Sequence, residues 1–402
     1  MKKAKSQQKR LGVATTNIGT FYEFFAGGGM ARAGLGPRWV CRFANDIDPM
    51  KSAVYRENWG GSEFVESDIR NVRIADLPGQ ADLAWASFPC QDLSLAGLGR
   101  GLNGERSSTF WPFYELINAL SREGRGPRCL VIENVCGALT SHNGKDFGEI
   151  ALALASIGYR FGAVGMDAAQ FVPQSRPRLF ILAVRADADL KNSLTSSQPD
   201  PQWHSTAVVR AHSGLHDRCK DRWIWWRIPA APKSNVRLVD LIEEDPEGVD
   251  WNTREQTSYL LSLMSEVNRE KVRAARRACE RMVGTVYRRT RPDGNGGRVQ
   301  RAEVRFDGVA GCLRTPAGGS SRQTILVVEG RRLRSRLLSP REAARLMGLG
   351  DEYVLPERYN DAYHVVGDGL VVPVVKHLAE HILEPLLTNF DHWGPVITLR
   401  FP

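Results

Sequence analysis

The chain has 402 residues, of which 42% are hydrophobic and 25% charged, so it is long enough for about two domains with buried cores. No apolar run approaches the roughly 18 residues of a membrane span, and the basic N-terminus leads into polar residues instead of an apolar signal core. Seven scattered cysteines without a C-x-x-C pair favour a reducing compartment over a disulfide framework. The sequence therefore predicts a cytoplasmic protein and excludes a membrane protein.

Charge is concentrated in one part of the chain. The formal net charge is +9, yet residues 201–340 alone hold 26 basic and 16 acidic side chains. The remainder of the chain is therefore close to neutral. A segregated basic segment of this kind indicates a polyanionic partner such as nucleic acid.

In the first half of the chain, β-branched and aromatic runs alternate with helix-like stretches. The alternation predicts an α/β fold with a doubly wound, mostly parallel sheet. Ligands of such sheets bind at the carboxyl ends of the strands, so the residues after each run are the first candidates for a site. We predict strands over residues 20–25, 40–45, 63–66, 83–87, 129–132 and 179–184.

The alternation ends near residue 186, where a polar, turn-rich stretch predicts a linker. Five of the ten tryptophans then fall within residues 203–251, and we expect them to form the core of a small domain rather than base-stacking platforms. The histidines and the cysteine of this region match no standard zinc spacing, so we expect no metal. They are His204, His212, His216 and Cys219.

A helical pattern returns after residue 337. Ser339 can cap this helix, Pro340 suits its first turn, and Glu342 completes a capping box. Both ends of the chain therefore build one α/β domain, with a basic domain inserted between them. The predicted divisions are a basic N-terminal tail over 1–18, the α/β domain over 19–190 and 332–392, and the inserted domain over 191–331.

A glycine-rich turn follows the first predicted strand, from Phe25 to Gly29. Asp46 ends the next strand, at the spacing from the turn that nucleoside-binding proteins use for an acid on the ribose. The turn is not a G-x-G-x-x-G motif, so a purely structural tight turn remains an alternative. An adenosyl ligand without a pyrophosphate would not need the missing phosphate cradle.

Other reactive side chains also lie at predicted strand ends. Cys90 follows a strand and a proline, a position where a thiol can be partly exposed and activated, although a buried structural thiol is the alternative. Glu133 ends an apolar strand, where burial would let it hold a proton near neutral pH, unless it is a helix cap or an ion-pair partner. Arg176 and Arg178 are two residues apart, so on an extended segment they face the same side and could bind a polar ligand together; surface arginines are the alternative.

The ordered motifs FFAGGG, SFPCQ, IENV, QSRPR, LLSPREAARLMG and VGDGL resemble those of the DNA cytosine-5 methyltransferases, over about residues 21–184 and 337–385. The resemblance implies a Rossmann-like sheet that binds S-adenosylmethionine, with an inserted target-recognition domain that binds double-stranded DNA. It implies methylation at carbon 5 of a flipped-out cytosine in a specific sequence. A monomer of bacterial or phage origin, with a restriction endonuclease acting on the same site, is expected.

The resemblance also implies roles for the candidate residues. Cys90 would add to carbon 6 of cytosine, and Glu133 would stabilise the charge that develops at nitrogen 3. Arg176 and Arg178 would hold the base oxygen and stabilise the charges around the thiolate. The DNA-binding residues expected from the family pattern and the basic insertion are Gln91, Ser94, Arg288, Arg289, Arg314 and Thr315.

The family's cofactor contacts fall on residues of this chain with one departure. Where the family reads G-N-[SA]-V, this chain has Gly367-Asp368-Gly369-Leu370, so an extra carboxylate replaces an amide. Two other functions remain open: a tRNA cytosine-5 methyltransferase, and a DNA-binding protein that has lost catalysis. The expected cofactor-binding residues are Phe25, Ala26, Gly27, Gly28, Gly29, Asp46, Ile47, Asp68, Ile69, Pro89, Asp368 and Leu370.

Overall fold

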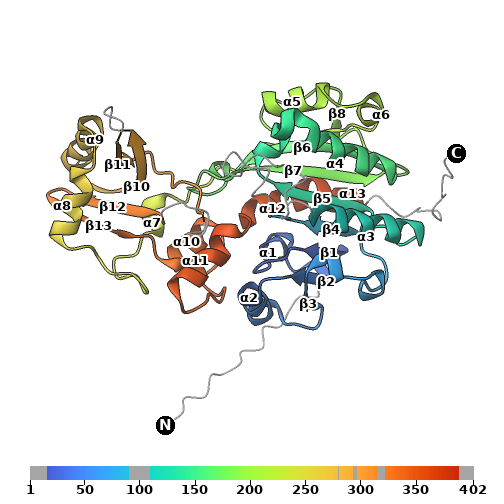
Figure 1. The fold of residues 1–402 in the computed structure, drawn as a ribbon, viewed down its shortest axis with the longest axis horizontal. Helices are drawn as coiled ribbons and strands as arrows, with labels where there is room; N and C mark the ends of the chain where they lie inside the picture. Colours follow the sequence, from blue (N-terminus) through green and yellow to red (C-terminus); the bar gives the residue numbers. More distant parts are fainter. Residues whose placement is uncertain (1–15, 90–108, 279, 293–296, 315–321, 389–402) are drawn as a thin grey trace, which may run out of the picture.

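The computed structural model describes residues 16–89, 109–278, 280–292, 297–314 and 322–388. These residues form two lobes, a large one around a seven-stranded sheet and a small one around a four-stranded sheet (Figure 1). None of the helices within these ranges has both the length and the apolar character needed to cross a membrane.

The large sheet has the strand order β3, β2, β1, β4, β5, β7, β6. Its strands are β1 (Gly19–Phe24), β2 (Trp39–Asp46), β3 (Phe64–Glu66), β4 (Leu83–Ala86), β5 (Cys129–Asn134), β6 (Tyr159–Asp167) and β7 (Pro177–Arg185). β1 to β5 are parallel to one another, whereas β7 runs antiparallel to both β5 and β6. The predicted α/β fold with a doubly wound, mostly parallel sheet is confirmed.

Helices cover both faces of this sheet, because successive strand residues point to opposite sides. On β1, Phe21 packs in the apolar cluster that includes α1 and α12, and Tyr22 in the cluster that includes α3 and α4. The helices of this lobe are α1 (Met30–Leu35), α2 (Pro49–Trp59), α3 (Phe110–Arg122), α4 (Lys145–Ser156), α12 (Val372–Leu378) and α13 (Glu384–Leu387). Shorter turns are the 3₁₀ segments Ile69–Asn71, Ile74–Asp76, Cys136–Leu139, Ser141–Gly144 and Ala168–Gln170 and the π turn Ala379–Leu383.

A tryptophan-rich segment packs against the β6 and β7 side of the large sheet. It contains β8 (Thr195–Ser196), α5 (Thr206–Ser213), α6 (Asp217–Lys220) and β9 (Trp225–Trp226). Trp226 donates its ring N–H to the Leu182 carbonyl at 3.2 Å, and Trp203 is fully buried. These tryptophans are core residues, as expected, but the core is that of the large lobe and not of the small one.

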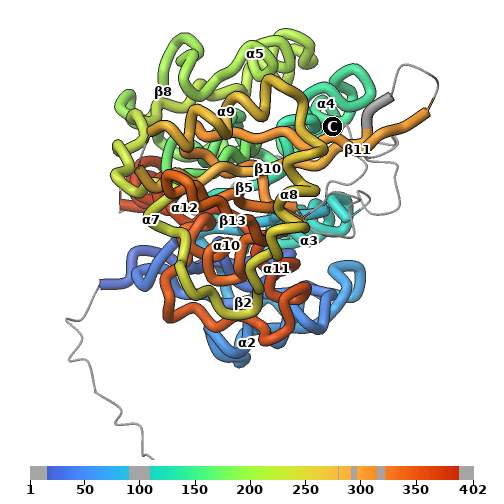
Figure 2. The backbone as a smooth tube through the Cα atoms, turned by 90° about the vertical axis from the view of Figure 1, so that its left-hand side faces the viewer, coloured from blue at the N-terminus to red at the C-terminus, as the bar shows by residue number. Residues whose placement is uncertain are grey.

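The small lobe is an antiparallel sheet with the order β11, β10, β12, β13. Its elements are α7 (Leu238–Leu241), α8 (Arg254–Ser262), α9 (Glu266–Arg277), β10 (Arg281–Pro292), β11 (Arg298–Arg305), β12 (Thr324–Glu329) and β13 (Arg332–Leu337). Seen from the side of this lobe, α8 and α9 lie in front of the sheet (Figure 2). The division 191–331 for the inserted domain remains a proposal; in the structure β8 and β9 lie with the large sheet, and β13 with the small one.

A buried ion pair joins the small sheet to α10 (Pro340–Leu346), which leads on to α11 (Tyr359–Asp368). Arg336 donates to both carboxylate oxygens of Glu342 at 2.6 and 2.7 Å, and neither side chain is exposed. Glu342 also accepts from the Glu243 backbone N–H and from that of Ser339, its capping-box partner. Because a buried charge needs such partners, this cluster fixes how the two lobes connect.

Candidate active site

Most of the sequence-predicted residues come together at the carboxyl ends of the parallel strands. The glycine-rich turn follows β1, Asp46 ends β2, Pro89 follows β4, and Glu133 lies at the end of β5. Since β2, β1, β4 and β5 are adjacent, these ends form one edge of the sheet. The predicted residues Cys90, Gln91, Ser94 and Thr315 lie outside the described part of the chain.

In the glycine-rich turn, some glycines are required by close packing, whereas one lies in open space. Phe25, Gly27 and Gly29 have positive φ, as the tight turn requires. A Cβ on Gly28 would come within 2.3 Å of the Tyr353 hydroxyl, and one on Gly29 within 2.3 Å of the Trp59 ring nitrogen. A Cβ on Gly27 would meet no atom of the described residues within 4 Å, so this part of the structure leaves the backbone open to a ligand there.

Asp46 is a buried carboxylate directly beside this open backbone. It accepts from the Gly27 N–H at 2.8 Å and from the Asp48 N–H at 2.9 Å. Burial raises the pKa of Asp46, although both N–H groups and the Lys51 ammonium act against that rise. The next side chain, Ile47, is 61% exposed. An apolar surface and a hydrogen-bonding carboxylate therefore stand side by side.

The other predicted cofactor residues occupy the surrounding elements. The Asp68 carboxylate is held by Arg70, which lowers the pKa of Asp68 through hydrogen bonds, and Ile69 is buried beneath it. Leu370 is buried after α11, and Pro89 is exposed. The structure brings these residues to the same lobe and leaves their roles to be tested.

Glu133 forms an ion pair with Arg178. The Arg178 Nε lies 3.1 Å from a Glu133 carboxylate oxygen, and both side chains are largely buried. β5 and β7 run antiparallel here, which places the two residues diagonally across the strands. The structure therefore presents a carboxylate and a guanidinium together at the strand-end edge, next to the end of β4.

Arg176 is placed differently from Arg178. The residue is 97% buried, and its guanidinium donates to the carbonyls of Leu313 at 2.9 Å and of Gly367 and Gly369 at 2.8 Å, and to the Cys312 sulfur at 3.4 Å. Burial lowers the pKa of Arg176, and Arg178 acts in the same direction. Four N–H groups of Arg176 are thus committed to two other segments of the chain.

Sequence reasoning did not single out two residues that organise the site. Gln174 donates to the Leu346 carbonyl at 2.9 Å and accepts from the Leu313 N–H at 3.2 Å, which ties the large sheet to the end of α10. Lys51 forms an ion pair with Asp368 at 2.6 Å. The first residue of the QSRPR motif could have flagged Gln174, whereas no local signal pointed to Lys51.

The basic residues of the small lobe divide between two faces. Val283 and Ile325 pack toward the large lobe, and alternation along β10 puts Arg289 on that same face. Arg301 stands directly opposite Arg289 on β11. Arg288 pairs with Ala302, which packs under α8 and α9, so it belongs to the other face.

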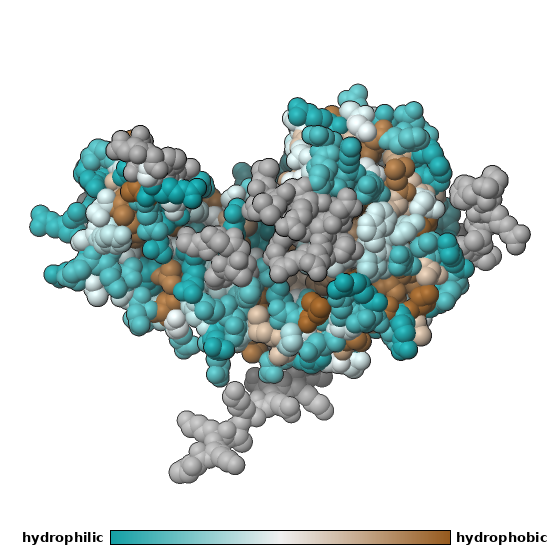
Figure 3. Space-filling view, in the orientation of Figure 1, coloured by the Kyte–Doolittle hydropathy of each residue, from teal (hydrophilic) through white to brown (hydrophobic). Residues whose placement is uncertain are grey.

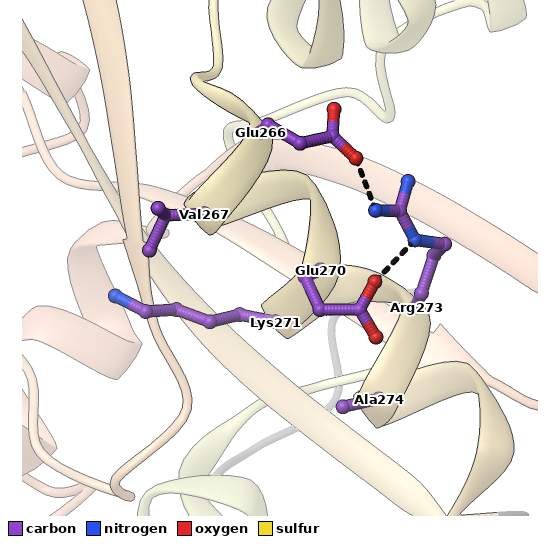
Figure 4. A pocket seen from close by; sticks show the side chains of 6 residues that line it. All are labelled: Glu266, Val267, Glu270, Lys271, Arg273 and Ala274. Atoms are coloured by element: carbon purple, nitrogen blue, oxygen red, sulfur yellow. Dashed lines mark hydrogen bonds and ion pairs between the residues drawn. The ribbon is translucent and has the colours of Figure 1, made fainter.

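A hollow on α9 is separate from this site. Its side chains interact with one another, since Arg273 bonds to Glu266 and Glu270 (Figure 4). The helix lies at the far end of the small lobe from the large sheet (Figure 1). This hollow therefore takes no part in the candidate active site.

The fold is that of a Rossmann-like methyltransferase. The S. pombe Dnmt2 methyltransferase superposes with a TM-score of 0.57 at 15% identity, over 93% of this chain and 99% of that one. The Entamoeba histolytica methyltransferase EhMeth gives a TM-score of 0.56 at 14% identity, over 93% and 99%. At these identities the likeness concerns the fold alone.

The sequence comparisons show the family. A family model for the C-5 cytosine-specific DNA methylase matches residues 19–384. The Type II methyltransferase M.BsuFI of Bacillus subtilis is 26% identical over 373 residues, 92% of this chain and 73% of the relative. M.HhaI of Haemophilus parahaemolyticus, also a Type II methyltransferase, is 25% identical over 365 residues, 90% and 93%. The chain belongs to the C-5 cytosine-specific DNA methylase family and is a DNA cytosine-5 methyltransferase, which confirms the resemblance of its motifs.

Glu23, on β1 just before the glycine-rich turn, is fully buried, and one of its carboxylate oxygens has no hydrogen-bond partner among the residues that the structure describes. Burial raises the pKa of Glu23 to about 8, although Arg32 acts to lower it. At pH values between the ordinary pKa of a glutamate and the raised pKa of about 8, Glu23 keeps its proton in the folded protein and releases it in the unfolded chain. The stability contributed by this group is therefore greatest at low pH and falls as the pH rises toward 8.

We expect Glu23→Gln to flatten this pH dependence, because the amide cannot ionise. The variant should be more stable than the unchanged protein at pH 8, by on the order of 1–3 kcal/mol, and gain little at pH 5. Urea unfolding at both pH values measures this difference. Glu57→Gln, on the exposed side of α2, is the control and should shift neither value. An equal effect of Glu23→Gln at both pH values would contradict the account.

Proposed function

We propose that the chain methylates carbon 5 of a flipped-out cytosine in a specific duplex sequence, through a covalent Cys90 adduct at carbon 6. The main support for this proposal is the arrangement of two groups at one edge of the sheet. The first is the ion pair of Glu133 with Arg178, and the second is the Asp46 carboxylate with the Gly27 backbone. Cys90 follows immediately after Pro89 at that edge. Reaction and cofactor residues thus come from neighbouring strand ends.

The residues present suit S-adenosylmethionine, which members of this family generally use. The open backbone at Gly27 and the exposed Ile47 beside the buried Asp46 fit an adenosyl group, with Asp46 bonding to ribose hydroxyls and Ile47 packing on adenine. When bound, this cofactor supplies a methyl group on a positively charged sulfur. The further residues proposed to hold it are Phe25, Ala26, Gly28, Gly29, Asp68, Ile69, Pro89, Asp368 and Leu370.

The chain's own residues activate the base. The Cys90 thiolate adds to carbon 6, which places electron density on carbon 5 and negative charge toward nitrogen 3. Glu133 hydrogen-bonds to nitrogen 3 and shares a proton with it as charge develops there, and Arg178, which pairs with Glu133 in the structure, holds the base oxygen. After methylation, loss of the carbon 5 proton expels the Cys90 thiolate and restores the aromatic ring.

Arg176 acts in this proposal as a positioning residue. Its Nη donors are taken by the backbone of two segments and by a thiol, so the base contact expected from the sequence falls to Arg178. Arg176 instead sets where the segment before Arg314 and the end of α11 lie relative to β7. A misplacement of about 1 Å there would lower the rate strongly.

The small lobe supplies the DNA surface. Its surface in Figure 3 is mainly hydrophilic. Arg289 and Arg301 stand directly opposite each other, and although Arg289 lies 3.8 Å from the Glu303 carboxylate, two adjacent cations favour an anion such as a phosphate beside them. Phosphate contacts from this face would offset the few kcal/mol needed to flip a base. Arg288, Arg314, Gln91, Ser94 and Thr315 remain proposed DNA contacts.

The Type II names of the relatives support a further proposal. We infer that a restriction endonuclease acts on the same DNA sequence, without direct contact, and that the methyltransferase works as a monomer.

Duplex DNA and labelled S-adenosylmethionine test the reaction directly. We expect label at carbon 5 of cytosine, and Cys90→Ser to lower the rate by about a thousandfold or more, because the hydroxyl is a poor nucleophile. Cys41→Ser, in β2, is the control and should keep the rate. Preference for tRNA over DNA as acceptor, or unchanged activity of Cys90→Ser, would overturn the proposal.

The arginine face is tested by the salt dependence of DNA binding. Arg289→Ala and Arg301→Ala should each weaken binding to duplex DNA and reduce the slope of log K against log salt by about one, because each removes a phosphate contact. S-adenosylmethionine affinity should stay unchanged. Arg288→Ala, on the opposite face, should have the smaller effect. If all three variants behaved alike, the assignment of faces would be wrong.

A further inference from the structure

Asp368, the residue that departs from the family pattern, has a partner in this chain. Its carboxylate lies 2.6 Å from the Lys51 ammonium, and the Lys51 side chain is only 17% exposed. The two residues are 317 positions apart, one in the first turn of α2 and the other at the end of α11. The pair therefore links α2, from the N-terminal part of the chain, to α11, from its C-terminal part.

The backbone around Asp368 is held on both sides. Arg176 bonds to the carbonyls of Gly367 and Gly369, so residue 368 has little freedom to move. A Cβ on Gly369 would lie 2.0 Å from the Met30 sulfur, and Met30 follows the glycine-rich turn. Asp368 is thereby placed beside that turn. A carboxylate at a helix C-terminus is unfavourable by itself, and Lys51 offsets this.

Carboxylates outnumber cations at this point. Asp46, Asp48 and Asp368 all interact with Lys51. Burial acts to lower the pKa of Lys51, but the three carboxylates outweigh it, and the pKa lies above its ordinary value. Lys51 therefore stays protonated, and the cluster keeps an excess of negative charge next to the turn.

We infer that Asp368, balanced by Lys51, sets the charge of the cofactor pocket and thereby its preference for S-adenosylmethionine over the demethylated product, S-adenosylhomocysteine. The inference rests on the proposed use of this cofactor. The two molecules differ by one positive charge at sulfur. The Asp368 side chain is 42% exposed, whereas Asp46 of the same cluster is buried, and the negative charge of this cluster favours the cation. A preference of this kind would speed the exchange of spent product for fresh cofactor.

The test is the ratio of two dissociation constants, for S-adenosylhomocysteine and for S-adenosylmethionine, measured by titration calorimetry. Asp368→Asn removes a negative charge and should lower this ratio about three- to tenfold. Lys51→Met removes the positive charge and should raise it by a similar factor. The double variant should return close to the ratio of the unchanged protein, because both charges are gone.

Controls separate charge from structure. Asp217→Asn, in an exposed pair with Lys220 on α6, makes the same charge change away from the turn and should leave the ratio unchanged. Thermal unfolding without ligand verifies that each variant is folded. Should Lys51→Met not fold, Lys51→Gln with the Asp368→Asn single variant gives the same comparison.

The outcomes distinguish this inference from the proposed function. If the unchanged protein bound neither molecule, the proposed cofactor itself would fail. If it bound and methylated normally but Asp368→Asn left the ratio unaltered, only the charge inference would fail. Shifts of the ratio in the same direction for Asp368→Asn and Lys51→Met would likewise overturn it, since opposite charges must act oppositely.

Discussion

A buried guanidinium must be surrounded by oxygen acceptors, and the position of Arg176 makes this requirement govern the whole site. Its acceptors come from the segment that leaves the small lobe and from the end of α11. Neither segment can move away without leaving a buried charge uncompensated, at a cost of several kcal/mol. The start of β7, the segment that leaves the small lobe and the end of α11 are therefore held together at one point.

This constraint explains how residues from distant segments are brought together at one site. Arg178, two residues further on, pairs with Glu133 at the strand-end edge. Through its bonds to the carbonyls of Gly367 and Gly369, the Arg176 guanidinium also holds the backbone around Asp368, whose carboxylate pairs with Lys51. The buried Arg336 and Glu342 pair plays a similar part further out, where it sets the exit of the small sheet into α10. Buried charges, rather than apolar contacts alone, define the relation of the lobes.

Much of the fold could be predicted because its signals are local. The strand and helix alternation, the glycine-rich turn and the capping box at Ser339 are each legible within a few residues. β6 was missed because its two glycines break the strand pattern; Gly162 is required there since a Cβ would lie 1.9 Å from the Ile224 carbonyl. For the site, the sequence predicted which residues belong to it but not which of them contact one another. The division of labour between Arg176 and Arg178, and the pairing of Lys51 with Asp368, depend on contacts between distant segments that no local pattern encodes.

Hydrogen exchange of Arg176→Met tests the central claim that one guanidinium ties these segments together. We expect amide protection to fall in both residues 309–314 and residues 365–370, while β4 and β5 keep theirs, because only the clamp is lost. Arg160→Met, the matched control, removes an arginine of β6 that bonds to the Ala188 carbonyl, and it should leave both segments protected. Unchanged protection, or a loss confined to one of the two segments, would contradict the account.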